Sequence, residues 1–128
     1  MGADLAYMGT RFINTKESEA PEEYRQMIID AGASDIVYTA AVSGVHANFL
    51  KPSLEAMGIT EEMWKQSAKV DFGEELSNDE AKAWKTIWSA GQGVTKIDDS
   101  PAVTELVERL KTEFKEAVTE QSKLLEKY

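Results

Sequence analysis

Residues 4–8, with the sequence DLAYM, constrain the fold of this chain more than any other stretch. Both alternating sets of side chains in this segment are apolar, which is typical of a strand buried inside a parallel sheet. Residues 35–40 (DIVYTA) and, weakly, residues 93–97 (GVTKI) are the other strand candidates. Two or three short strands cannot form a closed sheet around a buried one. We therefore expect the chain to be the end of a larger domain.

Two amphipathic helices are predicted from apolar spacing and from the residues at their ends. Residues 21–31 begin with a proline and two acidic residues and stop at Gly32. Residues 77–91 begin with a capping box, Ser77 to Glu80, and end where Gly91 can adopt the left-handed conformation. The apolar faces consist of Tyr24, Met27, Ile28 and Ala31 in the first helix and Ala81, Trp84, Ile87 and Trp88 in the second.

A longer helix is predicted over residues 101–125, with Ser100 as N-cap and Pro101 at the first helical position. Its apolar stripe consists of Val103, Leu106, Val107, Leu110, Phe114 and Val118. This stripe requires a surface to pack against. Shorter helical turns are expected at residues 51–57 and 60–68, and residues 70–77 are expected to form a loop.

The composition excludes several classes of function. The net charge is -9 and the pI about 4.6, and no cluster of basic residues is present, so nucleic acid is not expected as a partner. The absence of cysteine excludes thiolate metal sites and disulfides. No apolar stretch is long enough to span a bilayer, and no secretory signal is recognisable. We expect a cytoplasmic protein that does not bind membranes.

The segment GADLAYMGTRF, residues 2–12, resembles the last strand and following turn of the flavin-dependent (β/α)8 barrels of the nitronate monooxygenase, or 2-nitropropane dioxygenase, family. The resemblance continues through residues 16–32, 35–58 and 81–94. It implies an α/β fold in which this chain is the C-terminal part of an FMN-binding TIM barrel, mostly helical with two or three short strands. Residues 1–16 would be the last barrel strand and the phosphate loop, and residues 17–128 a helical C-terminal portion.

The same resemblance implies that Tyr7, Met8, Gly9 and Thr10 border the FMN phosphate. Gly9 has no side chain to block the approach of a phosphate, and Thr10 offers an amide and a hydroxyl to its oxygens. Related enzymes often have glutamine at the position of Tyr7, so the role of Tyr7 depends on its backbone. The activity implied is the oxidation of alkyl nitronates with O2 to carbonyl compounds and nitrite.

A second candidate is the segment SAGQGV, residues 89–94, in which glycines flank Gln92. The Gln92 amide could reach a flavin edge or a substrate oxygen. The alternative interpretation is a helix C-cap that leads into a turn. The family often has a further glycine where this chain has Thr95, which affects the backbone path of the loop.

Other polar and aromatic residues are interpreted as structural. His46 is the only histidine, but the family's catalytic histidine lies in a glycine-rich segment that His46 does not match, so a surface or loop-packing role is expected and no catalytic or metal-binding residue is assigned. Arg11 is expected to pack or to pair structurally and not to bind substrate. The acid pairs Glu22/Glu23, Glu61/Glu62 and Asp98/Asp99 are interpreted as helix caps, and Trp64, Trp84, Trp88 and Phe114 as core residues.

Two alternatives to a nitronate monooxygenase remain. Related FMN-dependent enoyl-thioester reductase and dehydrogenase barrels share the M-G-T-R-F turn, and the chain could also be a truncated or helical interaction protein without catalysis. The small-molecule partners implied are a nitronate and O2. Because residues 4–8 and the helix faces lack neighbours, we also expect self-association or pairing with the missing portion of a barrel.

Overall fold

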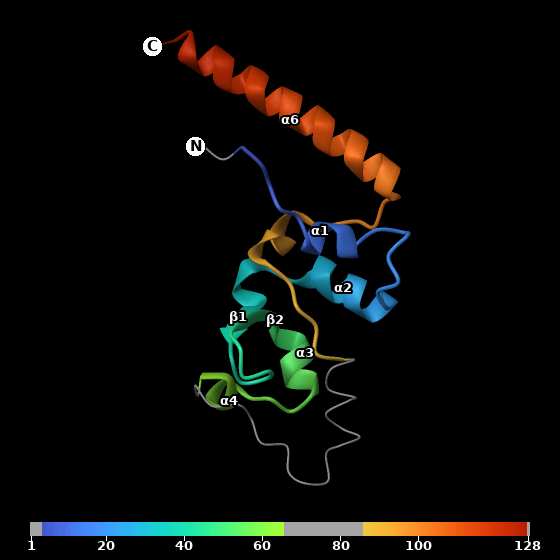
Figure 1. The fold of residues 1–128 in the computed structure, drawn as a ribbon, viewed down its shortest axis with the longest axis vertical. Coiled ribbons are helices and arrows are strands. Elements are labelled where there is room, and N and C mark those ends of the chain that lie inside the picture. Colours follow the sequence, from blue (N-terminus) through green and yellow to red (C-terminus); the bar gives the residue numbers. More distant parts are fainter. Residues whose placement is uncertain (1–3, 66–85, 128) are drawn as a thin grey trace.

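The computed structural model describes residues 4–65 and 86–127. Short elements form a body, and one long helix, α6, projects from it (Figure 1). The helices are α1 (Thr10–Ile13), α2 (Glu22–Asp30), α3 (Lys51–Ala56), α4 (Glu61–Lys65) and α6 (Val103–Leu125), the 3-10 turns are η1 (Ala33–Asp35) and η3 (Gln92–Lys96), and the strands are β1 (Ile36–Thr39) and β2 (Ala47–Leu50). The predictions for α2, α3 and β1 are confirmed to within two residues at each end.

β1 and β2 form an antiparallel pair in which Ile36 lies opposite Leu50 and Thr39 opposite Ala47. Sequence analysis did not predict β2, because its four residues show no clear alternation of apolar and polar side chains. The turn before β2 contains Gly44, whose φ of 75° is a conformation that favours glycine. The hairpin therefore follows from a turn and from tertiary packing more than from strand pattern.

β2 separates two buried clusters, because successive strand residues point to opposite faces. One cluster consists of Ile28, Ala31, Leu50, Ala90, Val94 and Ile97, and the other of Val42, Phe49, Leu54, Ile59 and Ile87. Leu50 and Phe49, which are adjacent in β2, thus belong to different clusters. The Leu50 amide also donates to the Trp88 carbonyl over 2.8 Å, which places residues 87–91 beside the hairpin.

Residues 4–8 form no strand in the structure, so the prediction of a strand in this segment is wrong for the chain as described. Leu5 is 93% exposed and Tyr7 is fully exposed. A strand needs a neighbour for its backbone N–H and C=O groups, and no described segment pairs with residues 4–8. The segment instead leaves the body on the same side as α6 (Figure 1).

The strand predicted weakly for residues 93–97 is also wrong, because most of this segment is the 3-10 turn η3. Val94 and Ile97, three residues apart, are both buried, which is the spacing of a 3-10 turn. Gly91 precedes η3 with a φ of -87°, so it is not the left-handed C-cap that was predicted. Residues 87–90 are not helical, and most of the predicted helix over residues 77–91, including its capping box, lies outside the described residues.

α6 begins two residues later than predicted, and Ser100 does not cap it. Its first free amides are bound by carboxylates: the Ala102 amide donates to Glu105 over 3.0 Å, and the Val103 amide donates to Glu17 over 2.9 Å. Acidic groups at a helix N-terminus are favourable because of the helix dipole. The N-terminus of α6 is thereby attached to the loop that precedes α2.

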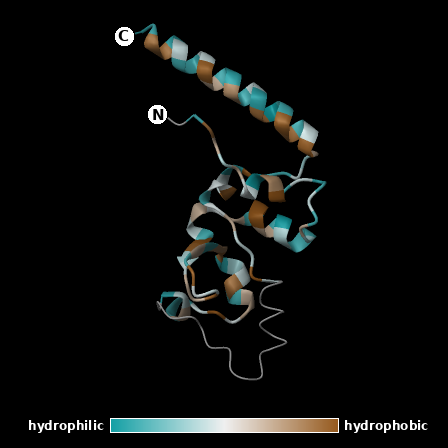
Figure 2. Ribbon diagram, viewed as in Figure 1, coloured by the Kyte–Doolittle hydropathy of each residue, from teal (hydrophilic) through white to brown (hydrophobic). Residues whose placement is uncertain are grey.

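The apolar stripe of α6 is only partly covered. Leu106 is buried, Leu110 is half-buried, and beyond residue 110 every described residue is exposed, including Phe114 (71%) and Val118 (50%). Figure 2 shows apolar residues recurring along α6 after the helix has left the body. The prediction that Phe114 is a core residue is therefore wrong. Within residues 4–65 and 86–127, no helix combines the length and apolar character needed to cross a bilayer.

Candidate functional site

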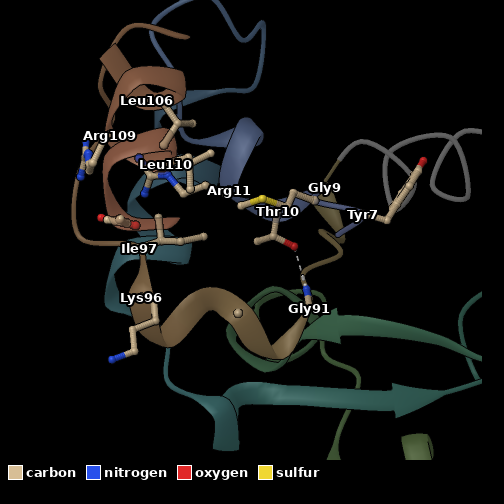
Figure 3. Close-up of a pocket in the computed structure, with 13 residues that line it drawn as sticks. Tyr7, Gly9, Thr10, Arg11, Gly91, Lys96, Ile97, Leu106, Arg109 and Leu110 are labelled. Atoms are coloured by element: carbon tan, nitrogen blue, oxygen red, sulfur yellow. Dashed lines mark hydrogen bonds between the residues drawn. The ribbon is translucent and has the colours of Figure 1, made fainter. Parts of the chain in front are cut away.

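A cavity of about 550 Å³ lies where three segments that are distant in sequence meet (Figure 3). Residues 7–11 form one wall, the η3 region a second, and the first turns of α6 a third. The η3 region contributes Gly91, Gly93, Lys96 and Ile97, and α6 contributes Leu106, Arg109, Leu110 and Glu113. We call this cavity the α6 pocket.

One hydrogen bond in the α6 pocket joins the two segments that sequence analysis selected, the turn at residues 7–10 and residues 89–94. The Gly91 amide donates to the Thr10 hydroxyl oxygen over 2.9 Å (Figure 3). Thr10 is the first residue of α1, and Gly9 is its N-cap, so the predicted turn does lead into a short helix. A hydroxyl that accepts one hydrogen bond keeps its own hydrogen to donate. The turn and the loop are therefore one structural unit.

Gly9 and Gly93 leave space in the pocket wall. A Cβ atom at either position would meet no atom within 4 Å. Gly9 has φ -102° and ψ -67°, which any residue can adopt. Neither backbone strain nor packing among the described residues requires glycine at position 9. Its absence of a side chain leaves this part of the wall open.

The loop before η3 is held in place by α2. The Tyr24 ring stacks on Trp88 with centroids 5.0 Å apart, and the Tyr24 hydroxyl donates to the Ser89 carbonyl. Burial raises the pKa of Tyr24, so the hydroxyl remains a donor at neutral pH. Trp88 and Trp64 pack against the buried clusters as predicted, and Trp84 lies outside the described residues.

One carboxylate joins two arginines at the pocket. Asp99 accepts a hydrogen bond from Arg11 on one oxygen and from Arg109 on the other, each over 2.7 Å. The hydrogen bond from Arg109 holds the pKa of Asp99 below its usual range, and Arg11 lowers it further. The prediction that Arg11 forms a structural pair is confirmed. The interpretation of Asp99 as a helix cap is wrong, since its carboxylate binds two guanidinium groups and no helix amide.

The pocket contains both basic and acidic side chains. The chain as a whole carries a net charge of -9 and 14 basic residues. Arg11, Lys96, Arg109 and Glu113 line the pocket, the Asp99 carboxylate beside it binds both arginines, and Asp98 and Glu113 also act on the charge of Arg109. The charges of the two arginines are therefore largely compensated by carboxylates at the same place.

The structure brings most of the predicted site residues to the α6 pocket. Tyr7, Met8, Gly9 and Thr10 line it, with the Tyr7 side chain fully exposed at its edge. Gln92 is exposed and does not line the pocket, although its neighbours Gly91 and Gly93 do. The assignment of these residues to a cofactor remains a prediction.

Sequence analysis did not find Lys96, Arg109 and the other α6 residues of the pocket. An apolar stripe indicates which face of a helix is covered, but it does not show that part of this face borders a cavity. The nearest signal was Arg109 itself, a basic residue between Leu106 and Leu110 of the stripe.

His46 lies elsewhere in the fold. It is exposed at the end of the β1–β2 turn, where its ring lies 5.0 Å from that of Tyr38. It does not line the α6 pocket, in agreement with the surface role expected of it. Among the described residues, no group of three or more His, Cys, Asp or Glu side chains could hold a metal ion. The pairs Glu22/Glu23 and Glu61/Glu62 lie in the first turns of α2 and α4, as predicted.

Comparisons with known proteins agree with this architecture. A sequence profile of a family described as nitronate monooxygenase matches residues 1–113. A nitronate monooxygenase from Paraburkholderia phytofirmans is 32% identical, over 92% of this chain and 34% of its own. This chain thus spans about a third of the length of that relative.

Two solved structures have a similar fold. The M276A mutant of FabK from Thermotoga maritima matches with a TM-score of 0.66 and 26% identity, over 94% of this chain and 36% of its own. FabK from the same organism without that mutation matches with a TM-score of 0.61 and 24% identity. The predicted fold class is confirmed: this chain, mostly helical with two short strands among the described residues, has the fold of part of a (β/α)8 barrel.

Proposed function

Because the chain belongs to the nitronate monooxygenase family, a family of enzymes, we propose that its α6 pocket holds the phosphate end of FMN. We further propose that the assembled protein oxidises alkyl nitronates with O2 to carbonyl compounds and nitrite. The observation that carries the proposal is the pocket itself, whose lining includes an open glycine turn, a threonine hydroxyl and basic side chains.

The donors present fit a phosphate group. The wall at Gly9 is open, and Thr10 supplies a hydroxyl that is already oriented by the Gly91 amide. Lys96 supplies positive charge at another wall of the same cavity, and Arg109, which is paired with Asp99, lies at a third. Phosphate is bound in proteins by this combination of short polar groups and cations.

The residues of this chain would bind and orient the cofactor. FMN, when bound, supplies the redox chemistry of the reaction. Ile97, Leu106 and Leu110 line the pocket with apolar surface and would exclude water from the part of the ligand they cover. We assign no catalytic residue to this chain, since His46 lies outside the pocket.

The activity is proposed for an assembly larger than the described elements. Residues 4–8 and the outer part of α6 expose apolar side chains, including Leu5, Tyr7 and Phe114. We propose that these surfaces are covered by self-association or by the remaining portion of a barrel, because exposed apolar patches mark interaction sites. The cytoplasm is the location we propose, with no nucleic-acid or membrane partner.

Replacement of Gly9 tests the cofactor proposal. Gly9→Val would place a branched side chain in the open wall, so retention of FMN should fall, whereas Thr10→Ser keeps the hydroxyl and should lower it less. FMN content would be measured by absorbance after gel filtration of the full chain. Equal FMN content in wild type and Gly9→Val would contradict the proposal.

A substrate screen tests the activity separately. Oxygen uptake and nitrite release with propyl nitronate are expected from the FMN-loaded assembly, and an enoyl-thioester reduction assay tests the alternative. Turnover of the enoyl thioester without nitrite release would assign the protein to the reductase alternative.

A further inference from the structure

We propose that Tyr24 of α2 is a positioning residue of the phosphate site: it holds residues 88–91 in place, and these residues orient the Thr10 hydroxyl for the flavin phosphate. This inference rests on the proposed function and deepens it, because α2 contributes no residue to the lining of the α6 pocket. Tyr24 acts through other residues and does not touch the ligand.

Residues 88–91 are fixed at their first residue by β2 and α3. The Trp88 carbonyl accepts a hydrogen bond from the Leu50 amide over 2.8 Å, and the Trp88 amide donates to the Ser53 hydroxyl over 3.1 Å. Leu50 and Ser53 are both buried, so water does not compete for these hydrogen bonds. The start of the segment therefore has a defined place beside the hairpin.

Tyr24 and Thr10 hold the rest of this segment from two sides. The Tyr24 ring stacks on Trp88 with an interplanar angle of 13°, and the Tyr24 hydroxyl donates to the Ser89 carbonyl. Gly91 follows two residues later, and its amide donates to the Thr10 hydroxyl over 2.9 Å (Figure 3). The position of the Gly91 amide, and with it the direction in which the Thr10 hydroxyl donates, therefore depends on Tyr24.

α2 is itself joined to the helix that begins at Thr10. Asn14 directly follows α1, and its side-chain amide donates to the Arg25 carbonyl of α2 over 2.9 Å. Asn14 is fully buried. The contacts thus form a closed ring that runs from Thr10 through α1, α2, Tyr24 and residues 89–91 back to Thr10. A binding group gains precision when such outer contacts fix its orientation.

A purely structural role is the alternative interpretation, in which Tyr24 only packs α2 against its neighbours. The two roles differ in their effects on FMN and on riboflavin, which has the same ring system and no phosphate. Misorientation of a phosphate donor weakens the binding of FMN alone. A loss of packing lowers the folded fraction and weakens the binding of both ligands.

The experiment measures the dissociation constants of FMN and riboflavin for the full chain by flavin fluorescence, together with amide hydrogen exchange at Gly91. Tyr24→Phe keeps the ring and removes the hydroxyl. Its preference for FMN over riboflavin should fall about fivefold from that of wild type, with riboflavin binding unchanged, and the Gly91 amide should exchange faster.

Thr39→Val is the matched control. It also removes one hydroxyl that donates to a backbone carbonyl, that of Trp64 over 2.7 Å, but it does so in the hairpin and away from residues 88–91. Thr39→Val should lower the unfolding midpoint and leave both the preference for FMN and the exchange of the Gly91 amide unchanged.

A double variant tests whether Tyr24 acts through Thr10. Thr10→Ala removes the hydroxyl, so the preference for FMN should fall. Adding Tyr24→Phe to Thr10→Ala should then cause no further fall, because the group that Tyr24 positions is already absent.

The other outcomes are distinguishable. A preference for FMN that Tyr24→Phe leaves intact, or equal weakening of both ligands, would overturn this inference and leave the proposed function standing. Additive losses in the double variant would overturn it as well, since Tyr24 would then not act through Thr10. Failure of wild type to prefer FMN over riboflavin would overturn the phosphate site, and this inference with it.

Discussion

Asp99 is the residue at which the charges of the α6 pocket meet, since its two oxygens bind arginines from the turn and from α6. The hydrogen bond from Arg109, with a further one from Arg11, holds the pKa of Asp99 below its usual range. The ionised carboxylate is thus favoured in the folded state. Its contribution to stability is complete above the pKa of an unfolded aspartate and is lost as the pH falls through the lowered folded value.

Asp99→Asn should therefore lower the free energy of unfolding at neutral pH, and its difference from wild type should disappear in acid. The effect should be modest, about 0.2–1 kcal/mol for an exposed pair, because the Asp99 side chain is 42% exposed. Urea unfolding between pH 7 and pH 2.5 measures it. Glu120→Gln is the control, because it also removes one negative charge, from an exposed position of α6. It should show no such difference in the free energy of unfolding. A stability difference that persists unchanged in acid would contradict the assigned cause.

At the scale of single residues, the sequence motif located the turn at residues 7–11 but not the pocket walls formed by η3 and α6. Gly9 and Thr10 could be predicted because a glycine followed by a hydroxyl residue after an apolar segment has a local chemical meaning. Lys96 and Arg109 could not, because their place at the pocket depends on how α6 and η3 fold against the turn. Gln92, which was predicted, lies outside the pocket lining because the 3-10 turn places its neighbours there.

At the scale of elements, periodic segments were predictable and segments defined by their neighbours were not. α2 and the course of α6 follow from apolar spacing. β2 and residues 4–8 depend on pairing: β2 forms because β1 lies beside it, and residues 4–8 form no strand because no described segment pairs with them. For η3, the β-branched residues of GVTKI favour a strand, whereas Val94 and Ile97, three residues apart, share a face only in a 3-10 turn.

At the scale of elements, we also predict that the exposed part of α6 is a contact surface. Phe114→Glu should reduce self-association or partner binding, because it places a charge in the apolar stripe, and it should leave the unfolding midpoint nearly unchanged, since Phe114 is 71% exposed. Mass by light scattering and a thermal melt measure the two effects. Thr112→Glu, on the opposite face of the helix, is the matched control. If wild type associates and Phe114→Glu has the same mass, the apolar stripe is not the contact surface.

At the scale of the whole molecule, we propose that three segments distant in sequence form one phosphate site. The turn at residues 7–11, the η3 region and the first turns of α6 surround the pocket, whose lining includes Arg11, Lys96 and Arg109. The family and the barrel-derived fold could be inferred from sequence, because the motif and the segments after it are specific. The pocket could not, because no local pattern brings residues 10, 91 and 109 together.

An amide NMR titration of the full chain with FMN tests this central claim most directly, since it reports which backbone groups respond to the ligand. The account predicts that the largest and saturable shifts occur at Gly9, Thr10 and Gly93, with smaller ones in the first turns of α6. Riboflavin should produce weaker shifts at Gly9 and Thr10, because it lacks the phosphate. Saturable shifts centred on the β1–β2 hairpin, with residues 9, 10 and 93 unaffected, would contradict it.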